Sequence, residues 1–247
     1  MKKKKWLSPL TKAMLLCLAM LCFFLFVRSQ FFAITAIRTE GLVQLRENDV
    51  LRLAGVEAGD NLFLAETEAL TRKVEMNPLV ADAEVVKNFP GGLIIRVTER
   101  TPAALILKEG GSSAVEVDRQ GFVLRVYESW PSGSLPVVTG LEETETPAPG
   151  KQINSGRLVS VLNMLRQMPP DIAPMVGEIN INNAGQIVLF LTSGIEARLG
   201  RSEQYEGKFA MLLELVSGEG FDATAAGVGY IDLTSSKPVL GGAAGVE

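Results

Sequence analysis

The chain has 247 residues, of which 47% are hydrophobic and 21% charged, a composition typical of a folded protein with room for one large or two ordinary domains. Residues 1–28 contain six cations and no acidic residue, so residues 29–247 keep 18 cations against 28 anions. Their net charge of −10 repels phosphates and excludes nucleic-acid binding. Histidine is absent and both cysteines, Cys17 and Cys22, lie in an N-terminal apolar run, which excludes histidine-dependent triads, ordinary zinc sites and a disulfide in the folded part.

The N-terminus combines a lysine cluster at positions 2–5 with an uncharged apolar run at positions 13–27. We predict a transmembrane helix over residues 13–32, after a tail of residues 1–12 that the positive-inside rule places in the cytoplasm. The alternative is a cleaved signal peptide, for which Ile34-Thr35-Ala36 is an acceptable cleavage context. The length of the run favours the uncleaved anchor.

The first folded segment shows five elements. Periodicity and turn residues predict a strand, two helices and two strands over residues 32–39, 46–54, 66–76, 79–87 and 93–98. Gly55 ends the first helix and Pro78 follows the second. Elements in this order can bury both helices on one face of a three-stranded sheet, which predicts a small α+β domain.

The second segment is richer in strands. Strands are expected over residues 103–107, 114–117, 122–127, 178–181, 186–191, 195–199 and 227–233. Two helices are expected, one capped by Asn154 or Ser155 and ended by Pro169-Pro170, the other over residues 203–216. The small residues that follow the last strand predict a disordered tail over residues 240–247.

Two features near residue 100 could have a functional meaning. Glu116 and Asp118 lie two apart on a predicted strand and face the same side, where they could form an acid pair or bind a hard metal ion. Since no nucleophile or companion base is indicated, we expect no catalysis and no cofactor. The run Glu99-Arg100-Thr101-Pro102 is expected to mark a domain junction, where Glu99 and Arg100 pair or face solvent.

Several short segments together suggest a family. In the first domain they are Ile37 to Gly41, Gly59 to Phe63, Asn77 to Val85, Asn88 to Pro90 and Val97 to Ala104. In the second they are Val117 to Gly121, Leu135 to Gly140, Arg198 to Gly200 and Tyr230 to Leu233. In this order and spacing after one span, the chain resembles, over nearly its whole length, the FtsQ/DivIB family of bacterial cell-division proteins.

The resemblance implies an α+β chain with one N-terminal transmembrane helix, a POTRA domain (β-α-α-β-β) over residues 33–101 and an FtsQ/DivIB-type β domain with two helices over residues 102–239. It also implies a non-catalytic divisome scaffold in the cytoplasmic membrane at the septum, with its bulk outside the cytoplasm. Such a scaffold links early and late division proteins to septal peptidoglycan synthesis. The implied partners are FtsB/DivIC-like and FtsL-like division proteins and other divisome membrane proteins, with no small-molecule substrate.

The last predicted strand is the expected partner site, because a strand near a chain end tends to lie at a sheet edge with unpaired backbone groups. The resemblance implies strand addition by the partner in this region. The residues carried over are Tyr230, Ile231, Asp232, Leu233, Lys237, Pro238 and Val239. An internal strand covered by its own neighbours is the alternative. Thr234-Ser235-Ser236 departs from the basic and aromatic residues common in the family at this point.

Two other functions remain as alternatives. A POTRA-containing transport or outer-membrane assembly component would also receive polypeptide by strand addition, but tandem POTRA repeats are not seen in this sequence. An extracytoplasmic hydrolase is disfavoured by the missing histidine and the isolated carboxylates. The scaffold is therefore the preferred hypothesis.

Overall fold

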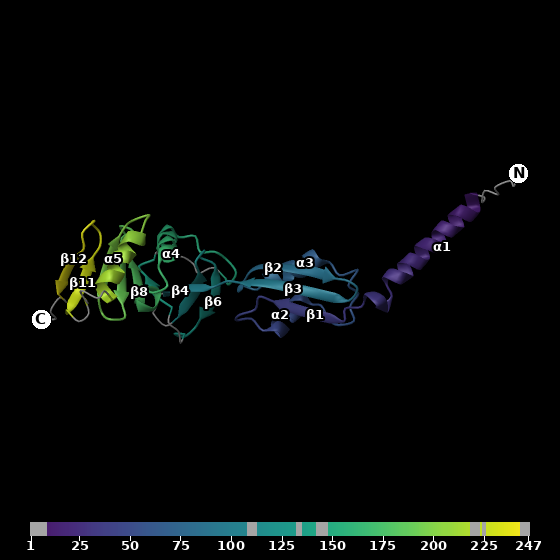
Figure 1. Cartoon of the computed structure of the whole chain (residues 1–247), viewed down its shortest axis with the longest axis horizontal. Coiled ribbons are helices and arrows are strands. Elements are labelled where there is room, and N and C mark those ends of the chain that lie inside the picture. Colours follow the sequence, from purple (N-terminus) through teal and green to yellow (C-terminus); the bar gives the residue numbers. More distant parts are fainter. Residues whose placement is uncertain are drawn as a thin grey trace. The chain divides into compact units, whose positions relative to one another are not determined.

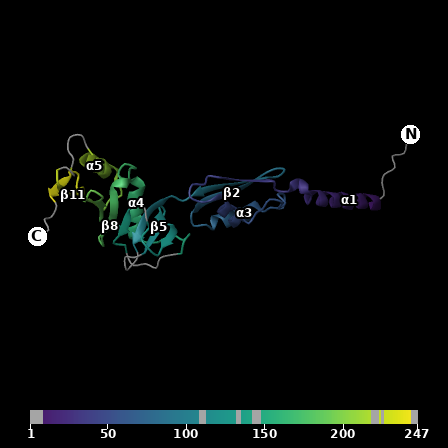
Figure 2. The same cartoon turned by 90° about the horizontal axis from the view of Figure 1, so that it is seen from below.

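The computed structural model describes residues 9–107, 113–131, 135–141, 148–217, 223 and 226–242 (Figure 1). The chain forms two compact units, residues 1–99 and residues 100–247. Helices and strands are combined in both units, which confirms the α+β fold class (Figure 2). Residues 1–8, which include the lysine cluster, and residues 108–112 and 142–147 lie outside the described part.

The first helix, α1 (Pro9–Val27), is long and apolar enough to cross a membrane, with a mean hydropathy of 2.4 over its most apolar window. Its 19 residues span about 29 Å at about 1.5 Å per residue, close to the ~30 Å hydrocarbon core of a bilayer. A short 3₁₀ helix, η1 (Gln30–Phe32), follows. The strand predicted from residue 32 therefore starts later, because this turn of helix occupies its first position.

The rest of unit 1 has the predicted order of elements. They are β1 (Ala36–Glu40), α2 (Glu47–Ala54), α3 (Thr67–Glu75), β2 (Val80–Asn88) and β3 (Gly92–Glu99). The sheet order is β1-β3-β2, with β1 parallel and β2 antiparallel to the central β3. α2 ends where Gly55 adopts a left-handed conformation (φ +66°), which a glycine reaches without steric cost.

Unit 1 buries its two helices on one face of this sheet. On β3, Leu93, Ile95 and Val97 alternate with more exposed residues and are buried. Val50 of α2 and Val74 of α3 are buried in the same cluster. The residues that alternate along the strand and the residues that recur at helical spacing therefore form one core.

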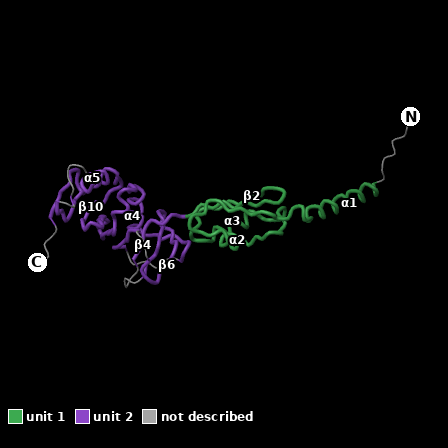
Figure 3. Tube along the Cα trace, turned by 60° about the horizontal axis from the view of Figure 1, so that its bottom comes forward, with its two compact units in different colours: residues 1–99 green, residues 100–247 purple. Residues whose placement is uncertain are grey.

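Unit 2, drawn in purple in Figure 3, contains one large sheet. Its strands are β4 (Pro102–Leu107), β5 (Ala114–Asp118), β6 (Val123–Tyr127), β7 (Val137–Thr139), β8 (Val176–Ile181), β9 (Ile187–Leu191), β10 (Glu196–Gly200), β11 (Val228–Asp232) and β12 (Val239–Gly242). They lie in the order β12-β11-β10-β9-β8-β7-β4-β5-β6. β8, β9 and β10, which follow one another in the chain, form an antiparallel meander. β7 and β12 are strands that the sequence did not predict.

Two helices pack on this sheet, α4 (Gly156–Gln167) and α5 (Glu206–Ser217), and a short 3₁₀ helix, η2 (Ala173–Met175), precedes β8. Ser155 caps α4 by accepting a hydrogen bond from the backbone N–H of Leu158, as the sequence predicted. On the buried side lie Leu158, Val161, Leu162 and Leu165 of α4 and Met168 directly after it. They belong to one core with Phe209 of α5 and the inner residues of the sheet.

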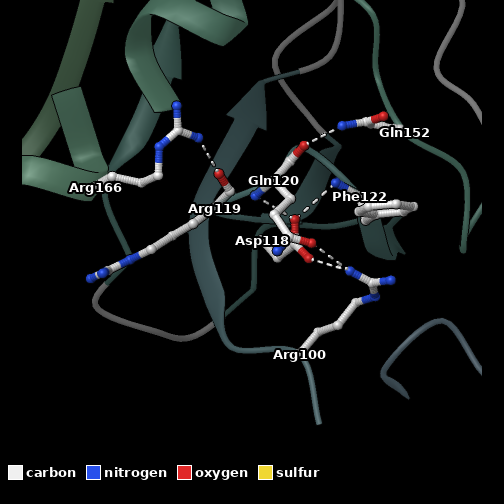
Figure 4. Close-up of polar contacts among 7 residues, drawn as sticks. All are labelled: Arg100, Asp118, Arg119, Gln120, Phe122, Gln152 and Arg166. Carbon is white, nitrogen blue, oxygen red and sulfur yellow. Dashed lines mark hydrogen bonds and ion pairs between the residues drawn. The ribbon is translucent and has the colours of Figure 1, made fainter. Parts of the chain in front are cut away.

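Adjacent residues at the junction are fixed to different units. The Glu99 carboxylate accepts hydrogen bonds from the backbone N–H groups of residues 43, 44 and 45, at 2.8, 2.8 and 3.0 Å. Arg100 instead donates to Asp118 of β5 at 2.8 Å, and its guanidinium lies 3.8 Å from the Phe122 ring centroid (Figure 4). The sequence left pairing and solvent exposure open for Glu99 and Arg100, and in the structure each side chain is bound within its own unit.

Candidate functional site

The large sheet ends in β6 on one side and β12 on the other. The outer side of β6 is partly covered, because Val123 exchanges backbone hydrogen bonds with Lys151 and Gly150 at 2.9 and 2.8 Å. Within the described residues, β12 pairs with β11 and has no strand on its other side. We call β11, β12 and the turn between them the C-terminal edge.

The predicted position of β11 at the edge of the sheet is wrong. β11 lies between β10, to which it is parallel, and β12, to which it is antiparallel. The chain turns back after Leu233 and forms one more short strand, β12. Most of this strand was predicted to be part of a disordered tail. Residues 240–242 belong to that strand, so this part of the tail prediction is also wrong, and residues 243–247 lie outside the described part.

The structure brings the seven predicted partner-binding residues together but gives them different environments. Ile231 and Leu233 are fully buried in the core of unit 2. Tyr230 and Asp232 are half-buried on β11, facing away from that core. Lys237 and Pro238 are exposed in the turn, and Val239 is 53% exposed on β12. Of the seven, Val239 alone lies on the edge strand.

A polar group covers the outer face of the sheet beside the edge. Arg198 on β10 donates through Nε to Glu196 at 2.7 Å, and this hydrogen bond raises the pKa of Arg198. The Arg198 guanidinium also lies 4.5 Å from the ring centroid of Tyr230, within the range of a cation–π contact. The tyrosine ring in turn covers Gly241 of β12, where a Cβ atom would lie 2.2 Å from Cε1 of the ring. The ring thus holds β12 against the sheet.

Asp232 fixes the start of the turn that leads to β12. Its Oδ1 accepts hydrogen bonds from the hydroxyl and the backbone N–H of Thr234, at 2.6 and 2.8 Å. These bonds, first of all the one from the hydroxyl, lower the pKa of Asp232, and Arg198 and Lys208 add to the effect. Lys208 donates to the carbonyl of Leu199, and burial lowers the pKa of this lysine. The carboxylate is therefore engaged in shaping the turn.

The arrangement is suited to binding a polypeptide strand. An open edge offers main-chain donors and acceptors, and side chains on alternate faces can add specificity. Val239 and Leu240 place exposed apolar side chains on opposite faces of β12. Sequence reasoning missed Leu240, Gly241, Glu196 and Arg198. Only the pairing register brings Leu240 opposite Ile231 and the other three residues to Tyr230.

The candidate acid pair has a structural role instead. Glu116 accepts a hydrogen bond from the Tyr127 hydroxyl at 2.6 Å and pairs with Arg125. Asp118 pairs with Arg100 and also accepts from the backbone N–H groups of Gln120 and Phe122. Within the described residues, no group of three or more His, Cys, Asp or Glu side chains could hold a metal ion.

Fold and site together define a two-unit α+β protein with a candidate membrane-spanning helix and a sheet edge open to another chain. The family profile described as "POTRA domain, FtsQ-type" matches residues 32–100, and "Cell division protein FtsQ/DivIB, C-terminal" matches residues 105–234. The chain therefore belongs to the FtsQ/DivIB family of cell-division proteins, as the sequence segments predicted.

Curated relatives agree with this assignment. The cell division protein FtsQ of Anaeromyxobacter sp. (strain K) is 29% identical over 208 residues, which are 83% of this chain and 69% of the relative. The FtsQ of Myxococcus fulvus is 28% identical over 204 residues, 81% of this chain and 70% of the relative. The solved structure of the major extracytoplasmic domain of DivIB from Geobacillus stearothermophilus matches with a TM-score of 0.36 at 14% identity, over 49% of this chain and 95% of that domain.

Proposed function

We propose that this protein is a non-catalytic scaffold of the division machinery, anchored in the cytoplasmic membrane, that binds a strand of a partner protein along β12. In this role it links early and late division proteins to septal peptidoglycan synthesis. The observation that carries the proposal is the open position of β12 at the end of the sheet, in a member of a cell-division family.

The anchor is α1, with the N-terminus in the cytoplasm and both folded units outside. The cluster of lysines before the helix and the acidic bulk after it support this orientation. A cleaved signal peptide fits less well, because cleavage after Ala36 would remove Ile34, which is 1% exposed in the core of unit 1. The loss of a fully buried isoleucine would destabilise that unit.

The partner class is a division protein of the FtsB/DivIC or FtsL type. A strand added to β12 would form main-chain hydrogen bonds and contact Val239 on one face of the sheet and Leu240 on the other. Tyr230, Asp232, Lys237 and Pro238 would border this contact, while Ile231 and Leu233 would support it from the core. Membrane anchoring of both proteins would promote binding, because it confines them to one surface and raises their effective concentration.

Photo-crosslinking in dividing cells tests the binding surface. A benzophenone amino acid replaces Val239 on β12 or, as a matched control, Val159 on the exposed side of α4, since these valines are 53% and 55% exposed. We expect irradiation to join position 239, but not position 159, to a single-span division protein. Equal crosslinking at both positions, or none at 239, would refute strand addition at β12.

The cellular role has a separate test. A fluorescent protein fused to the N-terminus, in cells depleted of the native protein, should form bands at midcell, and cells without the fusion should grow into filaments. A uniform envelope signal with normal division would contradict the division role and favour the transport alternative.

A further inference from the structure

Hydrogen bonds join the end of α1 and the residues that follow it to two loops of unit 1. The side chain of Asn61 donates to the carbonyl of Val27 at 2.8 Å, and the backbone N–H of Leu62 donates to Phe32 at 2.7 Å. On the second loop, the carbonyl of Gly91 accepts from the backbone N–H of Thr35 at 2.8 Å. The loops that contain residues 59–65 and 88–91 are thereby held close to the residues that follow the helix.

Aromatic side chains gather at this place. We define the phenylalanine cluster as Phe26, Phe31, Phe32, Phe63 and Phe89. Neighbouring ring centroids in the cluster lie between 5.1 and 6.3 Å apart, in the range of favourable aromatic pairs. The cluster connects the end of α1 with the tips of both loops.

The cluster is not part of the core of unit 1. None of its five rings is among the buried residues of that core, and Phe31, Phe63 and Phe89 are 60%, 45% and 52% exposed. Leu64, next to Phe63, is also exposed. So large an apolar surface at one place usually marks a contact with a partner or a membrane.

Position along the chain identifies lipid as the occupant. α1 ends at Val27 after about 29 Å of helix, so the residues just beyond it fall at the boundary between acyl chains and headgroups. Proteins that lie on a membrane surface bury apolar side chains such as Phe and Leu at this depth, and cations next to them can reach the phosphates. Arg28 and Lys87 lie beside the cluster, Arg28 over the Phe24 ring at 4.7 Å and Lys87 bonded to the carbonyl of Phe63 at 3.0 Å.

We propose that Phe31, Phe63, Leu64 and Phe89 enter the headgroup–acyl boundary of the bilayer that α1 spans. This end of unit 1 is then a lipid-binding surface. The inference rests on the proposed anchoring by α1 and adds a second contact, made by two loops of the folded unit, to the contact made by the helix.

The test uses the full-length chain, with its two native tryptophans replaced by phenylalanine and one new tryptophan introduced by Phe63→Trp, Leu64→Trp, Phe89→Trp or Val43→Trp. Each variant is reconstituted in phosphatidylcholine–phosphatidylglycerol vesicles whose lipids are brominated near the headgroup end of the acyl chains. Val43 is the control because it is 86% exposed and lies beyond the far end of β1, a strand of about 16 Å at ~3.3 Å per residue.

Bromine quenching should reduce tryptophan emission several-fold more at positions 63, 64 and 89 than at position 43. Co-flotation with the vesicles tests the anchor separately: a chain that does not float refutes both the anchor and the lipid contact. A chain that floats but shows no more quenching at positions 63, 64 and 89 than at position 43 overturns the lipid contact alone. If the tryptophan emission at these three positions is blue-shifted but not quenched, the cluster contacts a protein instead. If Phe63→Trp or Phe89→Trp prevents folding, the exposed Leu64→Trp variant decides the question.

Discussion

The pair of Arg100 and Asp118 should be important for the stability of unit 2. Asp118 accepts three hydrogen bonds, from the Arg100 guanidinium at 2.8 Å and from the backbone N–H groups of Gln120 and Phe122 at 2.8 and 2.9 Å. The two charged side chains are only 13% and 7% exposed. Asp118→Ala would leave a largely buried guanidinium without its counter-ion and two N–H groups of the turn without their acceptor.

The expected loss is large. Removing one partner of a buried ion pair costs about 3–5 kcal/mol, mainly because the remaining charge stays desolvated. A typical domain has a free energy of unfolding of about 5–15 kcal/mol, so this change would remove a substantial share of the stability of unit 2. With a urea m-value of about 2 kcal/mol/M, the unfolding midpoint should fall by roughly 2 M.

Urea unfolding of the solubilised chain measures this effect. In a Trp6→Phe background, the fluorescence of Trp130 reports on unit 2. Asp171→Ala is the matched control, because Asp171 is exposed and its removal should change the free energy of unfolding by less than about 0.5 kcal/mol.

A double variant tests the cause of the loss. Replacing both Arg100 and Asp118 by leucine removes the charges together and should cost less than Asp118→Ala alone, because no charge is left desolvated. If Asp118→Ala shifts the midpoint no more than the control, or if the double variant is the less stable of the two, the reasoning is refuted.

Three further predictions concern single positions. Gly140→Ala should destabilise unit 2 in thermal unfolding by well over the ~1 kcal/mol expected for Gly194→Ala. Both glycines have a positive φ, but only at position 140 would a Cβ atom lie 2.1 Å from a backbone carbonyl oxygen. Equal losses of stability in the two variants would contradict this. Gly241→Val should speed hydrogen exchange in β12 while Gly242→Val should not, since only the first collides with a tyrosine ring; the same exchange rates in both variants would count against it. The pKa of Asp232 lies below its ordinary value of 3.8, so its stabilising effect is complete above that value and is lost as the pH falls through the lowered pKa. Thr234→Ala should move the carboxyl resonance titration of Asp232 upward, and an unchanged titration would show that the hydroxyl has no part in the shift.

Local pattern determined most of the elements. The order strand, helix, helix, strand, strand in unit 1 could be predicted because Gly55 and Pro78 terminate helices through the chemistry of their own backbone. The α4 helix could be predicted from its cap at Ser155 and from the spacing of its apolar residues, and these residues are buried in the core of unit 2. The apolar N-terminal helix and the family could be predicted for the same reason, since they depend on composition and on short segments in a fixed order.

Pairing between distant strands was decided only by the tertiary structure. Nothing in Tyr230 to Leu233 tells whether a further strand follows, and β12 is short and contains two glycines, so its sequence has no clear strand pattern. β7 has three residues, too few to show alternation, yet it joins β4 to β8. The structural roles of Glu116 and Asp118 likewise could not be predicted, because their partners are brought to them only by folding. Tyr127 donates to Glu116, and Arg100 donates to Asp118. The sequence determined most of the strands and helices, but which edge of the sheet is left open depends on how the strands pair across the whole sheet.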